Sequence, residues 1–203
     1  MSETSAAAFL ELVAARRGHF RLESGHHSGL WLDLDALFSE PHRIAPFVDS
    51  LTTALRPYRV SVVCGPLVGG AFLAQLAAQA LQIEFCFTER LMPVQSVTLF
   101  QARYRLPLTF ASRVRGRRVA MVDDVMSAGS ALRGTYEELQ AHAAVPVVAG
   151  ALLILGSTGA DFFAQRGVAI ETVARDEYEL WLPEKCPLCA AHQPLVDVAA
   201  PAV

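Results

Sequence analysis

Two adjacent aspartates, Asp123 and Asp124, are the residues of this chain whose types and spacing are best suited to chemistry. They follow an apolar β-type segment, residues 119–122, and precede a small-residue turn at 127–130 and then a helix-forming run. Free backbone N–H groups at a helix N-terminus favour a phosphate, whereas carboxylates suit sugar hydroxyls or a metal ion that bridges to phosphates. A phosphorylated ribose fits both halves of the segment. The alternative is a doubly wound sheet protein whose acidic strand end binds another nucleotide or nothing.

A second glycine-containing loop follows another apolar stretch, residues 60–64. Its sequence is Gly65-Pro66-Leu67-Val68-Gly69-Gly70, and a helical pattern begins directly after it. Glycines that follow a strand let backbone N–H groups approach an anion closely. This loop is therefore a second candidate anion site.

Composition sets limits on what the chain can be. Its 203 residues predict a single domain, 1–203, and 53% are hydrophobic, which suits a buried parallel sheet. A net charge of −3 does not indicate the basic surface of a nucleic-acid-binding protein, and no apolar run is long enough to span a membrane. Four cysteines without a secretory signal indicate a reducing cytoplasm.

Apolar periodicity alternates between helix and strand along the chain. Helices are expected at 3–17, Pro41–Leu55, 71–80, 131–141 and 161–166, and strands within 18–35 and at 60–64, 84–88, 119–122, 147–155 and 170–173. Residues 89–112 lack clear periodicity, and the chain from Pro183 onward reads as irregular. The alternation predicts an α/β fold with a mostly parallel central sheet and its ligand at the carboxyl edge of the strands.

The segment from 119 to 130 resembles the ribose-phosphate motif of type I phosphoribosyltransferases. It has four apolar residues, two acids, two mostly apolar residues and a short Ser/Thr/Gly loop. The resemblance implies a central sheet flanked by helices, with a small N-terminal hood at about 18–36 and a C-terminal tail at 176–203. It further implies that phosphoribosyl pyrophosphate (PRPP) is held in three places: its ribose by Asp123 and Asp124, its 5′-phosphate by Ser127, Ala128, Gly129 and Ser130, and its pyrophosphate by Leu67, Val68, Gly69 and Gly70.

Two further segments are similar to orotate phosphoribosyltransferases. Residues 18–28 match the N-terminal G-x-F-x-L-x-S-G-x-x-S pattern, and residues 181–189 look like the tail of one bacterial subgroup. The resemblance thus spans about residues 18 to 195, and it implies conversion of orotate and PRPP to orotidine 5′-phosphate and pyrophosphate. Ser24 and Trp31 become candidate base-binding residues, although a core position for Trp31 is an equal alternative.

The same resemblance implies a homodimer in which loop 89–112 reaches the partner's site, and Mg²⁺ carried by PRPP rather than held directly by the protein. The family's loop supplies a lysine, but this segment has none, and the available cations are Arg90, Arg103 and Arg105. Arginine binds phosphate bidentately, so we expect Arg103 or Arg105 to neutralise pyrophosphate. We expect Asp124 to take part in proton transfer as well.

Three other departures bear on the substrate. Glu23 stands where the family has a basic residue, Ala128 replaces a loop hydroxyl, and Leu155 lies where an arginine pairs with the orotate carboxylate, to within one or two residues. Two alternatives stay open: a transferase of the same fold that acts on another base, and a non-catalytic sensor that keeps the ribose-phosphate site.

The tail contains a Cys-x-x-Cys pair. Cys186, Cys189 and His192 are spaced like part of a zinc site, but no second ligand pair of similar spacing follows, and Cys64 and Cys86 lie in apolar strands. A redox pair is disfavoured because the motif does not open a helix in the expected pattern. The preferred interpretation is a tail packed by Trp181, Leu188 and Leu195, with His26 and His27 as exposed turn residues.

Overall fold

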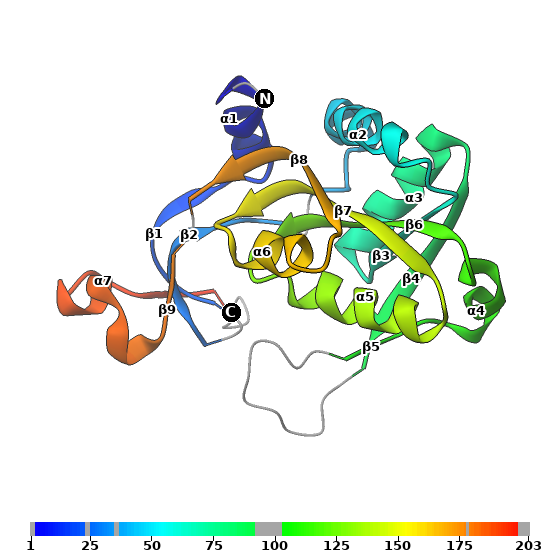
Figure 1. Ribbon diagram of the computed structural model, residues 1–203. Coiled ribbons are helices and arrows are strands. Elements are labelled where there is room, and N and C mark those ends of the chain that lie inside the picture. The colour runs from blue at the N-terminus through cyan, green and yellow to red at the C-terminus, as the bar shows by residue number, and fades with distance from the viewer. Residues whose placement is uncertain (1–2, 23–24, 35–36, 92–102, 178, 199–203) are drawn as a thin grey trace.

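The computed structural model describes residues 3–22, 25–34, 37–91, 103–177 and 179–198. Within these ranges the strands form two sheets, and Figure 1 shows the smaller one at the left of the larger. The strands are β1 (Arg16–Arg21), β2 (His27–Trp31), β3 (Val62–Pro66), β4 (Glu84–Arg90), β5 (Tyr104–Arg105), β6 (Arg118–Met126), β7 (Val145–Leu155), β8 (Ala169–Asp176), β9 (Leu180–Trp181) and β10 (Val196–Asp197). The helices are α1 (Glu3–Leu12), α2 (Pro41–Leu55), α3 (Gly69–Leu81), α4 (Leu108–Val114), α5 (Ser130–Ala141), α6 (Thr158–Ala164) and α7 (Pro187–Ala190), with 3₁₀ turns at Arg56–Tyr58 and Pro183–Lys185.

The larger sheet has the strand order β5-β4-β3-β6-β7-β8. All neighbouring strands in it are parallel except the β4–β5 pair. Its central strands are apolar and buried, since parallel sheets carry helices on both faces. The predicted α/β fold with a mostly parallel sheet is confirmed.

Helices cover both faces of this sheet (Figure 1). Alternate residues of β6 enter two separate cores: Ala120 and Val122 pack on the side of α1, α2 and α3, and Val119 and Met121 on the side of α5 and α6. This period of two follows from the alternation of side chains along a strand. The sheet is thereby fixed as a rigid platform whose carboxyl edge carries the loops.

The smaller sheet joins the two ends of the chain in the order β10-β1-β2-β9. β1 and β2 are antiparallel, β9 extends the sheet beside β2, and β10 runs parallel to β1. An ion pair of 2.5 Å between Arg21 and Asp197 accompanies the β1–β10 pairing. We call the sheet together with α7 the hood; α7 lies beside β9 in Figure 1.

Several predicted boundaries are wrong. The first helix ends at Leu12 rather than Arg17, because residues from Arg16 pair with β2. The strand expected at 119–122 continues through both aspartates to Met126, because Asp123 and Val125 pair with β7. In the segment expected to be aperiodic, β5 and α4 form, and the tail expected to be irregular contains α7 and β10.

Candidate active site

Asp123 and Asp124 lie near the C-terminal end of β6, and both are half-buried. Their carboxylates approach the N-terminus of α3. A Cβ at Gly69 would overlap the Asp124 carboxylate, and one at Gly70 would lie 2.7 Å from Asp123 Oδ1. Because neither glycine has a side chain, the two carboxylates have room beside the N-terminus of α3.

Backbone N–H groups hold the two carboxylates in place. The N–H of Asp124 donates to Asp123 Oδ1 at 3.1 Å, and the N–H of Val125 donates to Asp124 Oδ1 at 2.7 Å. Burial raises the pKa of Asp123, and the adjacent Asp124 carboxylate raises it further. Burial also raises the pKa of Asp124, against the lowering effect of the Val125 N–H. A pair with raised pKa values gains from a ligand that donates hydrogen bonds or carries positive charge.

The loop between β3 and α3 contains the predicted pyrophosphate residues. Leu67 and Val68 form a turn with a cis peptide bond between them, and Gly69 and Gly70 form the first turn of α3 rather than a loop. No side chain caps α3 at Val68, so the N-terminus of this 13-residue helix is open to an anion. The N–H of Leu67 is already used, since it donates to the Thr88 carbonyl at 2.8 Å.

The loop between β6 and α5 contains the predicted 5′-phosphate residues Ser127, Ala128, Gly129 and Ser130. Gly129 is the N-cap of α5 with φ of +73°, and no side chain caps this helix. The first turn of α6 supports the loop, because the Gly159 N–H donates to the Ser127 carbonyl at 3.0 Å. A second open helix N-terminus thus follows directly after the acidic pair.

A cleft of about 460 Å³ opens beside Asp124. Its lining comes from three places: the segment after β2 (Leu34, Phe38, Ser39 and Pro41), α3 with its N-cap (Val68, Gly69, Phe72, Gln75 and Leu76), and Asp124 itself. This volume lies within the range of small-molecule sites, and the lining is mostly apolar with a few polar groups, as such sites require.

Comparison with known proteins identifies the family. No protein-family model matches the chain. An orotate phosphoribosyltransferase of Carboxydothermus hydrogenoformans is 30% identical over 190 residues, which cover 93% of this chain and 92% of that protein. The chain belongs to the orotate phosphoribosyltransferase family. The enzyme of that name from Thermotoga maritima is also 30% identical, over 87% of each chain, and the crystal structure of orotate phosphoribosyltransferase from Aeropyrum pernix is 25% identical with a TM-score of 0.65, covering 83% of this chain and 92% of that one.

Family membership confirms the resemblance found in the sequence and the phosphoribosyltransferase fold. The protein is therefore a phosphoribosyltransferase, which is a kind of pentosyltransferase. No helix in the described ranges combines the length and apolar character needed to cross a membrane.

The candidate arginines of this orotate phosphoribosyltransferase homologue lie at the β4–β5 hairpin. Arg90 ends β4, Arg105 lies in β5, and the Arg103 carbonyl accepts the Leu91 N–H at 2.8 Å. Arg105 forms an ion pair of 2.6 Å with Glu89, and its side chain is 62% exposed. Arg90 and Arg103 are exposed as well. Residues 92–102 of the loop lie outside the described residues.

The candidate base-binding residues do not line the cleft among the residues that the structure describes. Ser24 lies outside the described residues, as does Glu23. Trp31 ends β2, half-buried, with the Arg16 guanidinium 5.2 Å from its ring centroid, and it does not line the cleft beside Asp124. Leu155 is 5% exposed in the core on the α2 side of the sheet.

Sequence reasoning missed three aromatic residues near the candidate site. Phe38 and Phe72 line the cleft, with ring centroids 5.5 Å apart. Tyr104 of β5 comes close to the acidic pair: burial raises the pKa of Tyr104, and the nearby Asp123 carboxylate raises it further. The signal for Phe38 was its position between the hood and a proline-initiated helix. Tyr104 lay in a segment without periodicity, where no local pattern pointed to it.

Three interpretations of the histidines and the tail are wrong. His27 is not an exposed turn residue: it lies in β2 and is 4% exposed, whereas His26 is half-buried. Leu195, expected to pack the tail, is 43% exposed. Cys186 is the N-cap of α7, so the Cys-x-x-Cys motif does open a short helix.

Proposed function

We propose that this protein transfers the 5-phosphoribosyl group of PRPP to orotate, giving orotidine 5′-phosphate and pyrophosphate in de novo pyrimidine biosynthesis. One observation carries the proposal: two carboxylates at the end of β6 lie between two helix N-termini that no side chain caps. PRPP has the matching order of groups, with a ribose diol between a pyrophosphate and a 5′-phosphate. The similarity over nearly the whole chain to enzymes named orotate phosphoribosyltransferase supports the same substrate.

Each candidate residue has a role in this proposal. Asp123 and Asp124 accept hydrogen bonds from the ribose hydroxyls, and the open N-termini of α5 and α3 receive the 5′-phosphate and the pyrophosphate. Positive charge near the pyrophosphate comes from Arg90, Arg103 and Arg105. The base attacks the anomeric carbon as pyrophosphate departs, so fixed charges near the leaving group lower the barrier.

We include Mg²⁺ as a cofactor that arrives on PRPP. Burial has raised the pKa values of Asp123 and Asp124, so the positive charge of Mg²⁺ carried by PRPP would favour the ionised form of both carboxylates. Mg²⁺ that arrives with PRPP would supply positive charge beside the leaving pyrophosphate.

We further propose a homodimer that shares the loop at 89–112, and a cytoplasmic location. The exposure of Arg90, Arg103 and Arg105 at the β4–β5 hairpin supports a role for them outside their own chain. The four cysteines are free thiols, which suits a reducing compartment.

A panel of bases tests the substrate. Pyrophosphate release from PRPP is measured with orotate, uracil, adenine and guanine, and orotate should be the efficient acceptor. The second candidate, a transferase for another base, is favoured by one observation: Leu155 is buried in the core, so this position offers no cation to an orotate carboxylate. Efficient turnover of a different base would establish that candidate, and binding of PRPP without any turnover would indicate the non-catalytic sensor.

A further inference from the structure

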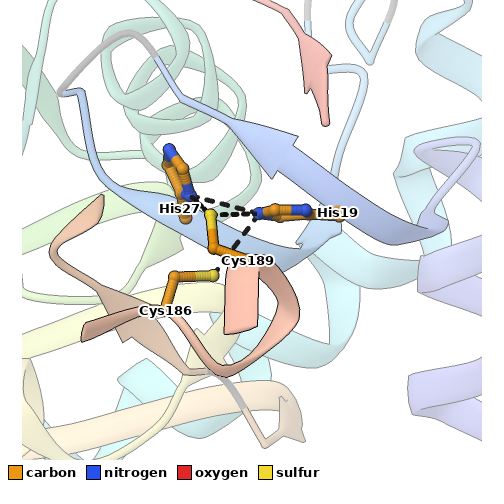
Figure 2. A group of neighbouring side chains, drawn as sticks. All are labelled: His19, His27, Cys186 and Cys189. Carbon is orange, nitrogen blue, oxygen red and sulfur yellow. Dashed lines mark hydrogen bonds between the residues drawn. The ribbon is translucent and has the colours of Figure 1, made fainter. Parts of the chain in front are cut away.

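Four side chains from opposite ends of the chain meet in the hood, away from every residue assigned to PRPP. His19 comes from β1, His27 from β2, Cys186 from the N-cap of α7 and Cys189 from within α7 (Figure 2). One nitrogen of each histidine and both sulfurs lie within 4.8 Å of one another. The feature is independent of the proposed function.

Four of the six separations within this cluster are close to those between ligands of one metal ion. His19 Nε2 lies 3.1 Å from His27 Nδ1, 3.4 Å from Cys186 Sγ and 3.6 Å from Cys189 Sγ, and Cys189 Sγ lies 3.3 Å from His27 Nδ1. A tetrahedral Zn²⁺ with ordinary Zn–N and Zn–S bonds separates two nitrogens by about 3.3 Å and a nitrogen from a sulfur by about 3.6 Å. The observed distances fit these edges to within a few tenths of an ångström.

The hydrogen bonding of His19 orients its lone pair toward the other three groups. His19 Nδ1 lies 2.9 Å from the Gln193 carbonyl oxygen, which can only accept, so the proton of the neutral imidazole is on Nδ1. Nε2 then carries a lone pair, and three groups converge on it. A backbone carbonyl that fixes the tautomer in this way is the usual outer partner of a metal-bound histidine.

Burial and donor chemistry indicate the kind of metal. His19, His27 and Cys186 are each less than 5% exposed, and Cys189 is half-buried, so the cluster is closed to substrate. Two thiols and two imidazoles with Cys-x-x-Cys spacing suit Zn²⁺ in a structural site. The thiols are free rather than joined as a disulfide.

The surrounding elements are short enough to need such a link. β9 and β10 have two residues each and α7 has four, and no described residue after Asp176 belongs to either hydrophobic core cluster. Elements of this size bury too little apolar surface to hold a fixed position on their own, and a structural metal is a common substitute for a core.

We propose that His19, His27, Cys186 and Cys189 bind one Zn²⁺ ion, which fastens the C-terminal tail to the β1–β2 hairpin of the hood. The site differs from the partial site suggested by the tail sequence, because its second ligand pair comes from the hood. His192, although three residues from Cys189, is exposed and is not one of the four ligands.

Metal content tests the proposal on the full-length protein, purified without a histidine tag and without added metal or chelator. Elemental analysis should find about one zinc per chain. Cobalt exchanged into the wild type should give the intense visible spectrum of a tetrahedral site with thiolate ligands. Metal-free protein that takes up neither ion, or a Cys186–Cys189 disulfide found by mass spectrometry, would overturn the proposal.

Variants then assign the ligands. Cys189→Ser and His27→Ala should each lower zinc content, and the matched controls Cys86→Ala and His192→Ala should retain it. Loss of zinc from the His192→Ala protein, or its retention in the Cys189→Ser/His27→Ala double variant, would contradict the four-ligand set. If a ligand variant fails to fold, zinc stoichiometry and the cobalt spectrum of the wild type decide the outcome. Removal of zinc from the wild type should also expose the tail after Leu180 to limited proteolysis, whereas a merely packed tail would keep its resistance.

Discussion

Burial raises the pKa values of both Asp123 and Asp124, and the adjacent Asp124 carboxylate raises the pKa of Asp123 further. In the unfolded chain each carboxyl ionises near the ordinary aspartate pKa of about 3.9. Between that pH and the higher pKa of the folded state, the folded protein binds more protons than the unfolded chain. The contribution of the pair to stability is therefore complete at low pH and is lost as the pH rises through the folded pKa.

The first prediction follows from this sign. Asp123→Asn removes a charge that the fold disfavours, so the free energy of unfolding at pH 8 should increase relative to the wild type. The same change should weaken PRPP binding by about 1.5–3 kcal/mol, or roughly 10- to 150-fold, because a charged hydrogen bond to the ribose is lost. Denaturant unfolding and PRPP titration measure the two effects.

The control for this experiment is Asp49→Asn, on the exposed surface of α2. It should change neither stability at pH 8 nor PRPP binding. A destabilised Asp123→Asn protein, or one that binds PRPP as the wild type does, would count against the assigned role of the acidic pair.

For Leu155 the structure and the sequence predict opposite effects of a substitution. From the sequence, Leu155→Arg should restore the family's arginine that pairs with the orotate carboxylate. Its side chain is 5% exposed and packs in the core, so the new guanidinium would be buried without a partner. We expect a loss of about 3–5 kcal/mol of stability and no gain in orotate use.

Thermal unfolding of Leu155→Arg beside the volume-conserving control Leu155→Met checks this prediction. An improved orotate affinity in a stable Leu155→Arg protein would restore the original alignment. If orotate is the substrate, its carboxylate requires a different cation, and Arg175 is available on β8, exposed and paired in register with Ile154 of β7.

At the level of elements, the sequence predicts those helices and strands whose positions are determined by a local residue pattern. The helix Pro41–Leu55 is predicted to the residue, and the central strands are predicted to within a few residues, because apolar periodicity and a proline in the first turn are local signals. The acidic pair was recognised, but its strand character was missed, because the pairing of Asp123 with Ala151 of β7 is a tertiary interaction.

The hood could not be predicted in the same way. β9 and β10 consist of two residues each, which is too short for any periodic pattern, and they exist because they pair with β2 and β1. The sequence predicts an exposed turn at His27 because nothing near it indicates Cys189, which contacts its ring from 162 residues later in the chain. Only the fold brings these groups together.

The N-terminus of α3 gives a prediction at this scale. Gly69→Ala introduces a methyl group into the space of the Asp124 carboxylate, which must then shift. PRPP binding should fall by at least tenfold, since the helix N-terminus and the acid would no longer converge. Titration with PRPP measures this loss.

The matched control is Gly29→Ala in the hood. A Cβ at Gly29 would make only ordinary contacts of 3.8 Å, so its PRPP binding should stay close to that of the wild type. Unchanged binding in Gly69→Ala would show that the contact between α3 and Asp124 does not matter for the ligand.

At the scale of the whole molecule, the two sheets carry different features. The larger sheet carries the acidic pair and both open helix N-termini at one edge, while the hood beside it pairs strands that follow α1 with strands of the C-terminal tail (Figure 1). The segment after β2 lines the cleft together with α3 and Asp124, so the path from the hood into α2 contributes directly to the candidate site. Stability of the hood should therefore influence how the base is enclosed.

The last prediction concerns assembly. If the protein is a dimer in which each loop at 89–112 serves the partner's site, a chain carrying Asp124→Asn and a chain carrying Arg103→Ala and Arg105→Ala should complement each other. In the mixed dimer one site combines intact acids with an intact loop, and the other site combines both defects. Random exchange of subunits makes half of the dimers mixed, so about a quarter of the wild-type activity should return.

Arg105 also pairs with Glu89 in its own chain, so Glu89→Gln is the control for loss of that ion pair alone and should retain activity. Activity of the mixture is measured after refolding the chains together, with the dimer verified by light scattering. A verified mixed dimer without recovered activity would show that each site is completed within one chain, and the arginines of the β4–β5 hairpin would then act on their own subunit.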